Sequence, residues 1–217
     1  LRRGDHARPL AGVLTMGYQQ SPFRQAKVQA GGILRKSLRK SLDNSWRTPE
    51  SILDRVRVFF GGQIPLDPAT SPDNPTGAAV FCAGIGPLFA DGTPAKASGL
   101  DLPWDAPTWV NPPYGASLRT WLGKMVAEAK RVRARPIVTL LPCSRWEMPY
   151  LTAILGDALV CFHRGRVKFI SSIDGKPVAG NPGANMLVGL NADEARFVEA
   201  FGSLGPCYRL TEIARAS

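Results

Sequence analysis

The chain has 217 residues, 44% of them hydrophobic and 20% charged, which fits a soluble globular protein with one core of moderate size. No apolar run approaches the roughly 20 residues that cross a membrane, and the short apolar piece near the N-terminus predicts no signal peptide, so we expect no membrane partner. The four cysteines are scattered without a C-x-x-C pair, which argues against a metal site or a disulfide framework and favours free thiols in the cytoplasm.

Positive charge is concentrated at the start of the chain. The formal net charge is +10, and residues 1–45 hold nine Lys or Arg against two acidic residues. Residues 46–217 are nearly neutral, with 18 Lys or Arg against 15 acidic residues. We expect a basic, partly disordered leader over residues 1–45 and one folded domain over residues 46–217. Such a leader indicates a polyanionic partner, most simply nucleic acid, although a solvated tail without a binding role has the same composition.

The folded domain is predicted to begin with a helix over residues 49–59. Thr48 is the expected N-cap and Pro49 the first helical residue, and the pair Gly61-Gly62 is expected to end the helix. A short apolar strand, residues 64–67, follows and ends in Asp67. A carboxylate at the end of a strand can accept hydrogen bonds from ribose hydroxyls or a ligand ammonium group, and an ordinary turn aspartate is the alternative.

Near the middle of the chain, the buried strand predicted over residues 108–110 runs into Asn111-Pro112-Pro113-Tyr114. The two prolines have no N–H group for a sheet ladder, so the strand has to end there. The first proline also pushes Asn111 toward an extended conformation. The result is a stiff turn that carries an amide, two free carbonyls and an aromatic ring, which are the groups needed to hold the amino group of a planar base.

The rest of the domain alternates between predicted strands and helices. Helices are expected over residues 118–133, 144–155 and 192–201, and strands over residues 136–141, 158–162, 167–170, 185–190 and 207–210, with residues 78–83 either strand or helix. This pattern predicts an α/β three-layer domain with a mainly parallel sheet and an antiparallel edge. Ligands bind beyond the carboxyl ends of the strands in such sheets, so Asp67 and Asn111 are expected to face one site.

Five short segments occur in a set order along the domain. They are Trp46-x-Thr48-Pro49, Leu66-Asp67-Pro68-Ala69-Thr70-Ser71, Gly99-Leu100 with Pro103-Trp104, Trp109-Val110-Asn111-Pro112-Pro113-Tyr114-Gly115 with Trp121, and Leu140-Leu141-Pro142 with Arg145-Trp146 and Gly165-Arg166-Val167-Lys168-Phe169. This ordered set resembles the phage-type DNA N6-adenine methyltransferases of the Dam family. The Asn-Pro-Pro-Tyr segment alone is less specific, because it also occurs in protein-glutamine and RNA adenine methyltransferases.

The resemblance implies an S-adenosylmethionine-dependent enzyme with the class I, Rossmann-like methyltransferase fold. The implied cofactor-binding residues are Thr48, Pro49, Asp67, Pro68, Ala69, Thr70 and Asn111. The implied catalytic residues are Asn111, Pro112, Pro113 and Tyr114. The sequence departs from the pattern in two places: no glycine-rich loop follows Asp67, and Ser98 stands where an acid often precedes Gly99.

The implied substrate is DNA, and the residue types suit the chemistry. The Asn111 oxygen and the Pro112 carbonyl can each accept one N–H of the adenine amino group, which frees the nitrogen lone pair. Tyr114 would stack on a base extracted from the duplex. The residues expected to contact nucleic acid are Tyr114, Arg145, Arg164, Arg166 and Lys168. Methylation of cytosine N4, of RNA adenine or of protein glutamine remains as an alternative, as does a catalytically inactive nucleic-acid-binding relative.

Overall fold

The computed structural model describes residues 46–82, 87–89, 98–143, 154–156, 158–178 and 183–210, with the backbone alone for residues 87–89. The chain divides into two units, Leu1–Ser41 and Leu42–Ser217, and all the described residues belong to the second. The predicted leader and Arg145 lie outside the described residues, so the boundary at residue 45 stays a prediction. No helix in the described ranges is long and apolar enough to cross a membrane.

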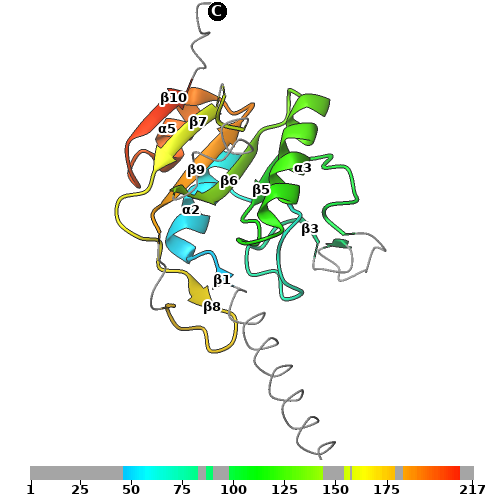
Figure 1. The fold of residues 1–217 in the computed structure, drawn as a ribbon, viewed down its shortest axis with the longest axis vertical. Coiled ribbons are helices and arrows are strands. Elements are labelled where there is room, and N and C mark those ends of the chain that lie inside the picture. The colour runs from blue at the N-terminus through cyan, green and yellow to red at the C-terminus, as the bar shows by residue number, and fades with distance from the viewer. Residues whose placement is uncertain are drawn as a thin grey trace, which may run out of the picture. The chain divides into compact units, whose positions relative to one another are not determined.

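The second unit is an α/β domain (Figure 1). Its described helices are α2 (Glu50–Phe60), α3 (Leu118–Arg131) and α5 (Glu194–Phe201). Its described strands are β1 (Trp46–Arg47), β2 (Leu66–Asp67), β3 (Val80–Cys82), β4 (Pro87–Phe89), β5 (Thr108–Val110), β6 (Ile137–Pro142), β7 (Ala158–Phe162), β8 (Ile170–Ser171), β9 (Asn185–Leu190) and β10 (Cys207–Leu210).

Eight of these strands form one mixed sheet in the order β10-β7-β9-β6-β5-β2-β3-β4. The four strands at its centre, β6, β5, β2 and β3, are parallel. Strand β9 runs in the opposite direction between β6 and β7, and β10 and β4 add antiparallel pairs. The predicted antiparallel edge is therefore present, but antiparallel pairing occurs on both sides of the parallel centre rather than at one edge.

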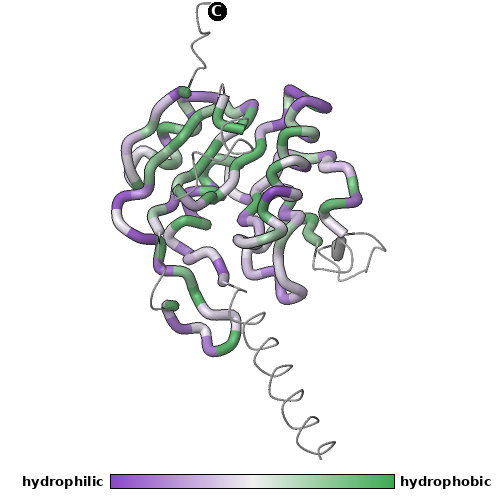
Figure 2. Tube along the Cα trace, viewed as in Figure 1, coloured by the Kyte–Doolittle hydropathy of each residue, from purple (hydrophilic) through white to green (hydrophobic). Residues whose placement is uncertain are grey.

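Helices cover both faces of the sheet, so the domain has three layers (Figure 1). Helices α2 and α5 share one apolar cluster, which includes Trp109 of β5 and Leu140 of β6. Helix α3 packs into the other cluster with Val110 and Leu141 from the same two strands. Successive strand residues thus face opposite layers, as the two-residue period of a strand requires. Hydrophobic residues accordingly follow the central strands (Figure 2).

Helix α2 begins one residue later than the sequence predicts. Pro49 occupies the N-cap position with an extended backbone, and the helix has no side-chain cap. The Pro49 carbonyl accepts hydrogen bonds from the amides of Ile52 and Leu53, at 3.0 and 3.2 Å. The predicted N-cap role of Thr48 is wrong, because its hydroxyl is turned to Asn111 instead. The predicted end is confirmed, since Gly61 is left-handed with φ 82°.

One predicted strand differs from the structure. Only Ile170–Ser171 forms a strand in the region predicted as residues 167–170, and it pairs with β1 in a separate two-stranded sheet. Val167 and Phe169 are buried while Arg166 and Lys168 are exposed, so the segment alternates like a strand although the strand itself begins at Ile170. The predicted helix over residues 144–155 lies mostly outside the described residues.

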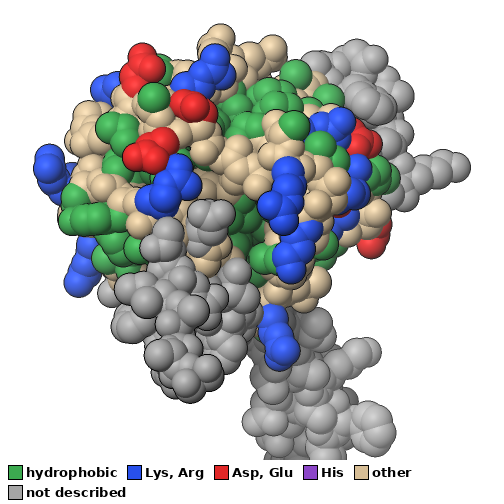
Figure 3. All heavy atoms as spheres, turned by 90° about the horizontal axis from the view of Figure 1, so that it is seen from above, with side chains coloured by type: hydrophobic (Ala, Val, Ile, Leu, Met, Phe, Trp, Pro, Cys, Tyr) green, Lys and Arg blue, Asp and Glu red, His purple; other side chains and the backbone are tan. Residues whose placement is uncertain are grey.

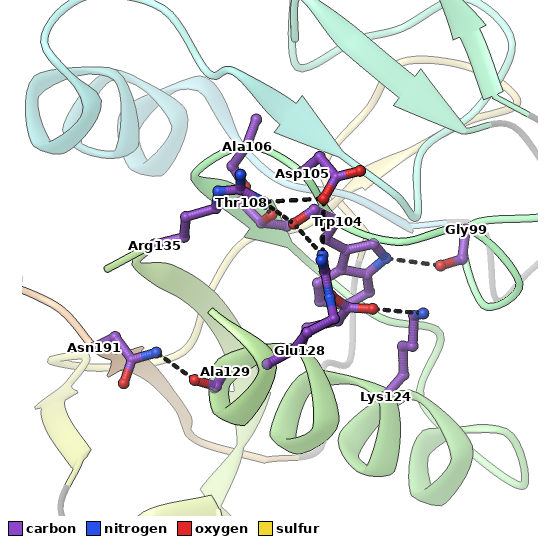
Figure 4. A network of polar contacts seen from close by, with 11 residues as sticks. Gly99, Trp104, Asp105, Ala106, Thr108, Lys124, Glu128, Ala129, Arg135 and Asn191 are labelled. Atoms are coloured by element: carbon purple, nitrogen blue, oxygen red, sulfur yellow. Dashed lines mark hydrogen bonds and ion pairs between the residues drawn. The ribbon is translucent and has the colours of Figure 1, made fainter. Parts of the chain in front are cut away.

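A charged network fixes the turn that leads into β5 (Figure 4). Arg131 and Arg135 both donate to the Asp105 carboxylate at 3.0 Å, and Arg131 also donates to the Trp104 carbonyl at 3.1 Å. The nearly buried Glu128 accepts from Arg131 at 2.7 Å, which holds that guanidinium in place. These contacts tie the start of β5 to α3, so the residue that follows the strand has a defined position.

Candidate active site

Two polar side chains lie at the carboxyl ends of neighbouring central strands. Asp67 is the last residue of β2, and Asn111 directly follows β5, which pairs with β2 in parallel. The strand that follows β2 in the sequence, β3, lies beside β2 on the side away from β5. The strand that follows β5, β6, lies beside β5 on the side away from β2. The strand order therefore reverses between β2 and β5, and ligands of open α/β sheets bind at such a reversal. The topology brings both residues to the carboxyl ends of neighbouring strands, and that their side chains face one site stays a prediction.

Among the described residues, the side-chain amide of Asn111 has a partner at only one end. Its Nδ2 donates a hydrogen bond to Thr48 Oγ1 at 3.2 Å, although the two residues are 63 positions apart. Its Oδ1 is buried and has no hydrogen-bond partner among the described residues. Leaving a buried acceptor unpaired costs about 1–3 kcal/mol and is uncommon in native proteins. A ligand that donates a hydrogen bond would account for this atom.

The prolines after Asn111 turn the chain away from the sheet. Pro112 is buried and Pro113 is exposed. Gly115 follows with φ 124°, where a side chain would be strained, and its carbonyl accepts from the amide of Leu118 at 3.2 Å. The turn is therefore short and stiff, and it leads directly into α3.

Tyr114 is anchored through its hydroxyl group. The hydroxyl donates to the Leu140 carbonyl at 3.1 Å and accepts from Asn185 Nδ2 at 3.3 Å. Phe169 meets the ring edge-on, with the ring centroids 6.1 Å apart. Burial raises the pKa of the hydroxyl well above its usual range, so this group stays protonated. The ring is thus held in one orientation while the residue as a whole is only half-buried.

Asn185 and Phe169 both contact Tyr114, although neither is predicted from the sequence as a site residue. Asn185 is 1% exposed and stands at the start of β9, whose other residues are apolar. An asparagine within such a strand is a usable signal, because a buried amide needs partners. The sequence does not single out Phe169 in the same way, since an aromatic residue in an alternating segment is expected simply to pack in the core.

Asp67 is 2% exposed, and hydrogen bonds compensate only partly for the burial of its carboxylate. Its Oδ1 accepts from the amide of Ala69 at 3.0 Å. The Thr76 hydroxyl is within reach of Asp67 and also lies 3.2 Å from Asn74 Oδ1, and its single proton can serve one acceptor at a time. Burial therefore outweighs the hydrogen bonds and raises the pKa of Asp67 to about 6.

The loop after Asp67 is held between two other segments. The amide of Thr70 donates to the Cys82 carbonyl at 3.1 Å, which joins the loop to the end of β3. On its other side Gly99 lies against Pro68, and a Cβ built at Gly99 would stand 2.0 Å from the Pro68 carbonyl oxygen. Trp104 Nε1 fixes this approach by donating to the Gly99 carbonyl at 2.8 Å. Trp104 is itself 3% exposed and therefore has a packing role.

Replacing Gly99 with alanine should destabilise the domain by about 3 kcal/mol, because the backbone of the loop has to move to admit one methyl group. Gly123→Ala is the matched control. Gly123 lies within α3 and its Cβ would have no neighbour within 4 Å, so this change should stabilise by up to about 1 kcal/mol. Chemical unfolding of both variants tests the contact, and equal stability of the two would contradict it.

The basic residues near the end of β7 are exposed. Arg164, Arg166 and Lys168 are all accessible to solvent, and none forms an ion pair within the described part of the chain. Their segment begins close to the site, because the amide of His163 donates to the Asn185 carbonyl at 3.1 Å. On the face shown in Figure 3, Lys and Arg side chains lie in separate groups, several beside Asp or Glu, rather than in one continuous patch.

The described residues contain no group of three or more side chains suited to a metal ion. The four cysteines are unpaired, and burial raises the pKa of Cys82 to about 11, so this thiol, near Asp67, stays protonated. The polar groups at the site are therefore hydrogen-bond acceptors and a buried carboxylate, which suit an uncharged or cationic donor ligand.

One protein-family model matches most of the sequence. The family model described as DNA N-6-adenine-methyltransferase (Dam) matches residues 35–197, which include Thr48, Asp67 and the segment from Asn111 to Tyr114. No curated protein matches the sequence.

Proposed function

The chain belongs to the DNA N-6-adenine-methyltransferase (Dam) family, and from that premise we propose that it uses S-adenosylmethionine as methyl donor and Asn111 as the main acceptor for the adenine amino group. The protein is a DNA adenine methyltransferase that modifies N6. The observation that carries the catalytic assignment is the buried, unpartnered Oδ1 of Asn111 at the reversal of the strand order. No observation favours cytosine, RNA or protein as the substrate.

We infer the class I methyltransferase fold from the same topology. The parallel centre, the helices on both faces and the reversal beside β2 all support it. The four unpaired cysteines fit a cytoplasmic enzyme.

The proposed cofactor site lies around Asp67. Burial raises the pKa of this carboxylate, so donors on the cofactor, its ribose hydroxyls or its ammonium group, would stabilise the ionised form. Pro68, Ala69 and Thr70 would border the cofactor from the loop, and Thr48 and Pro49 would lie at its methionine end. When bound, the cofactor supplies an electrophilic methyl group on a sulfonium centre.

Asn111 and Pro112 activate the adenine in this proposal. The exocyclic nitrogen is a poor nucleophile, because its lone pair is delocalised into the ring. Asn111 Oδ1 and the Pro112 carbonyl each accept one of its N–H bonds, which favours a tetrahedral nitrogen with a free lone pair. The same acceptors stabilise the positive charge that develops on nitrogen during transfer. The proton leaves afterwards, so no strong general base is needed.

Tyr114 provides a fixed surface for the extracted base. Stacking requires a ring face with a defined orientation, and the bonds of the hydroxyl to Leu140 and Asn185 hold the ring in place. Pro113, exposed beside it, would limit where the base can lie. Arg145 is also proposed to contact DNA, from a segment outside the described residues.

Arg164, Arg166 and Lys168 are proposed to contact DNA phosphates. Replacing all three with glutamine should weaken DNA binding and lower the slope of log affinity against log salt by about 0.9 for each phosphate that is no longer neutralised. Arg196→Gln is the control, because Arg196 is an exposed arginine near the start of α5. This helix follows β9, which runs antiparallel to β7 and therefore finishes at the opposite end of the strands from Arg164, Arg166 and Lys168. Fluorescence anisotropy at several salt concentrations measures both variants, and an unchanged slope in the triple variant would rule out phosphate contact.

Cofactor binding and methyl transfer test the proposal separately. Calorimetric titration of the intact protein should show S-adenosylmethionine binding, and the methyl label should appear on N6 of adenine in duplex DNA. Label on RNA or protein alone would contradict the substrate, and a protein without cofactor binding would be an inactive relative.

A further inference from the structure

Thr48 and Asn111 belong to distant segments of the chain, yet their side chains form a direct hydrogen bond. We propose that Thr48 is a positioning residue: by accepting from Asn111 Nδ2, it turns the amide so that Oδ1 faces the adenine amino group. This inference rests on the proposed function and deepens it. It assigns to the Thr48 hydroxyl a task that is separate from contact with the cofactor.

The need for such a residue follows from the chemistry of an amide. One end of the Asn111 side chain donates hydrogen bonds and the other accepts them, and the two ends exchange places when the group rotates by half a turn. Only the acceptor end can bind the N–H groups of adenine. An acceptor on the protein side of Nδ2 therefore favours the productive orientation, and the Thr48 oxygen is the acceptor that contacts Nδ2.

The position of Thr48 is fixed on both sides along the chain. The two residues before it form β1, in which Trp46 and Arg47 pair with Ser171 and Ile170. The residue after it is Pro49, whose φ is −67° and whose carbonyl starts α2. Thr48 itself is 8% exposed, so water has little access to its side chain. A hydroxyl held in this way can determine the orientation of a neighbouring amide.

The two other roles open to a threonine at this position have less support. Helix capping is excluded by the structure, since α2 has no side-chain cap. A purely apolar packing role would leave the hydroxyl unexplained, because valine would fill the same volume with no polar atom to bury.

The test compares Thr48→Val with Thr48→Ser. Valine keeps the shape but removes the acceptor, so the orientation that presents Oδ1 to adenine loses the bond that favours it, and we expect kcat to fall by about tenfold to a hundredfold. Serine keeps the hydroxyl and should retain kcat within about threefold. Because Thr48 is also proposed to lie at the methionine end of the cofactor, the affinity for S-adenosylmethionine is measured by calorimetry in both variants, and in Thr48→Val it should fall far less than kcat. A parallel loss of cofactor affinity and kcat in Thr48→Val would overturn the proposal in favour of a cofactor contact.

Repeating Thr48→Val in an Asn111→Asp background isolates the orientation effect. A carboxylate presents an oxygen in either orientation, so the loss caused by Thr48→Val should shrink to a few-fold there. Equal losses in the two backgrounds would show that Thr48 does not act by orienting the amide. Failure of the catalytic assignment itself is distinguishable, because Asn111→Ala would then remain active.

Nuclear magnetic resonance provides a readout that is independent of activity. The side-chain amide signals of Asn111 are identified by their absence in Asn111→Asp. In the wild type we expect one amide proton protected from exchange by the bond to Thr48, and in Thr48→Val we expect that protection to disappear while the backbone spectrum is retained. Protection that persists in Thr48→Val would refute the contact.

Discussion

Replacing Asn111 with alanine is expected to lower kcat by two to three orders of magnitude, about the effect of removing one preorganised hydrogen-bonding group from a transition state. The variant lacks the unpartnered Oδ1, whereas the Pro112 carbonyl remains as the second acceptor. Because the missing interaction strengthens as charge develops on nitrogen, the effect should appear in kcat more than in KM. Single-turnover methyl transfer to duplex DNA measures the chemical step.

The stability of this variant should change far less than its activity. Alanine removes a buried oxygen without a partner, so the free energy of unfolding should not fall by more than about 1 kcal/mol despite the loss of the bond to Thr48. Cofactor affinity should stay within a few-fold. Ser117→Ala, an exposed residue in the same connection with no side-chain cap bond, is the activity control. A fully active Asn111→Ala enzyme would remove Asn111 from the mechanism.

The sequence predicts those parts of the fold that depend on local rules. Helix α3 follows from apolar residues at helical spacing, and the end of α2 follows from Gly61 in a left-handed conformation. The turn at Asn111 follows from two prolines that cannot extend a sheet. In each case the determining residues are neighbours along the chain, so no knowledge of the tertiary structure is needed.

The contacts that define the site depend on tertiary structure and are not predictable in this way. Thr48 has every local feature of an N-cap, but the better partner for its hydroxyl is an amide 63 residues away. Gly99 resembles any turn glycine, although its lack of a side chain is required by the Pro68 carbonyl. Asn185 bonds to Tyr114 because β9 lies beside β6, and sheet order is not visible in one strand.

The segment from Val167 to Phe169 shows how a local rule fails. Its buried and exposed residues alternate as in a strand, yet the ladder begins only at Ile170. Alternating burial indicates which side chains face the core, but it does not predict that the segment pairs with a neighbouring strand. Here the burial has another use, since Phe169 packs against Tyr114 and Trp46.

Replacing Asp67 with asparagine is expected to stabilise the free protein above pH 6 and to impair cofactor binding. The folded state raises the pKa of Asp67 from 3.8 to about 6, so folding favours the protonated form. The stability contributed by this group is therefore greatest at low pH and falls as pH rises from about 4 through 6. The change corresponds to about 3 kcal/mol. Asparagine cannot ionise and can still accept from the Ala69 amide.

The measurement is the difference between wild type and Asp67→Asn in free energy of unfolding, taken from pH 4 to pH 8. A difference is needed because other acids act with the opposite sign: hydrogen bonds from Arg131 and Arg135 lower the pKa of Asp105. We expect the difference to grow in favour of asparagine up to about pH 6 and then to level off. Asp105→Asn is the control, and its difference curve should not favour asparagine in this range.

Cofactor binding should show the reverse dependence on pH. A cofactor that donates hydrogen bonds to Asp67 prefers the ionised carboxylate, so wild-type affinity should weaken as pH falls below about 6, while the weaker affinity of Asp67→Asn should be nearly independent of pH. The buried carboxylate of Asp67 would then lower the stability of the free protein, and cofactor binding would offset that cost. Wild-type affinity that stays constant between pH 5 and pH 8 would separate Asp67 from the cofactor and confine its effect to folding.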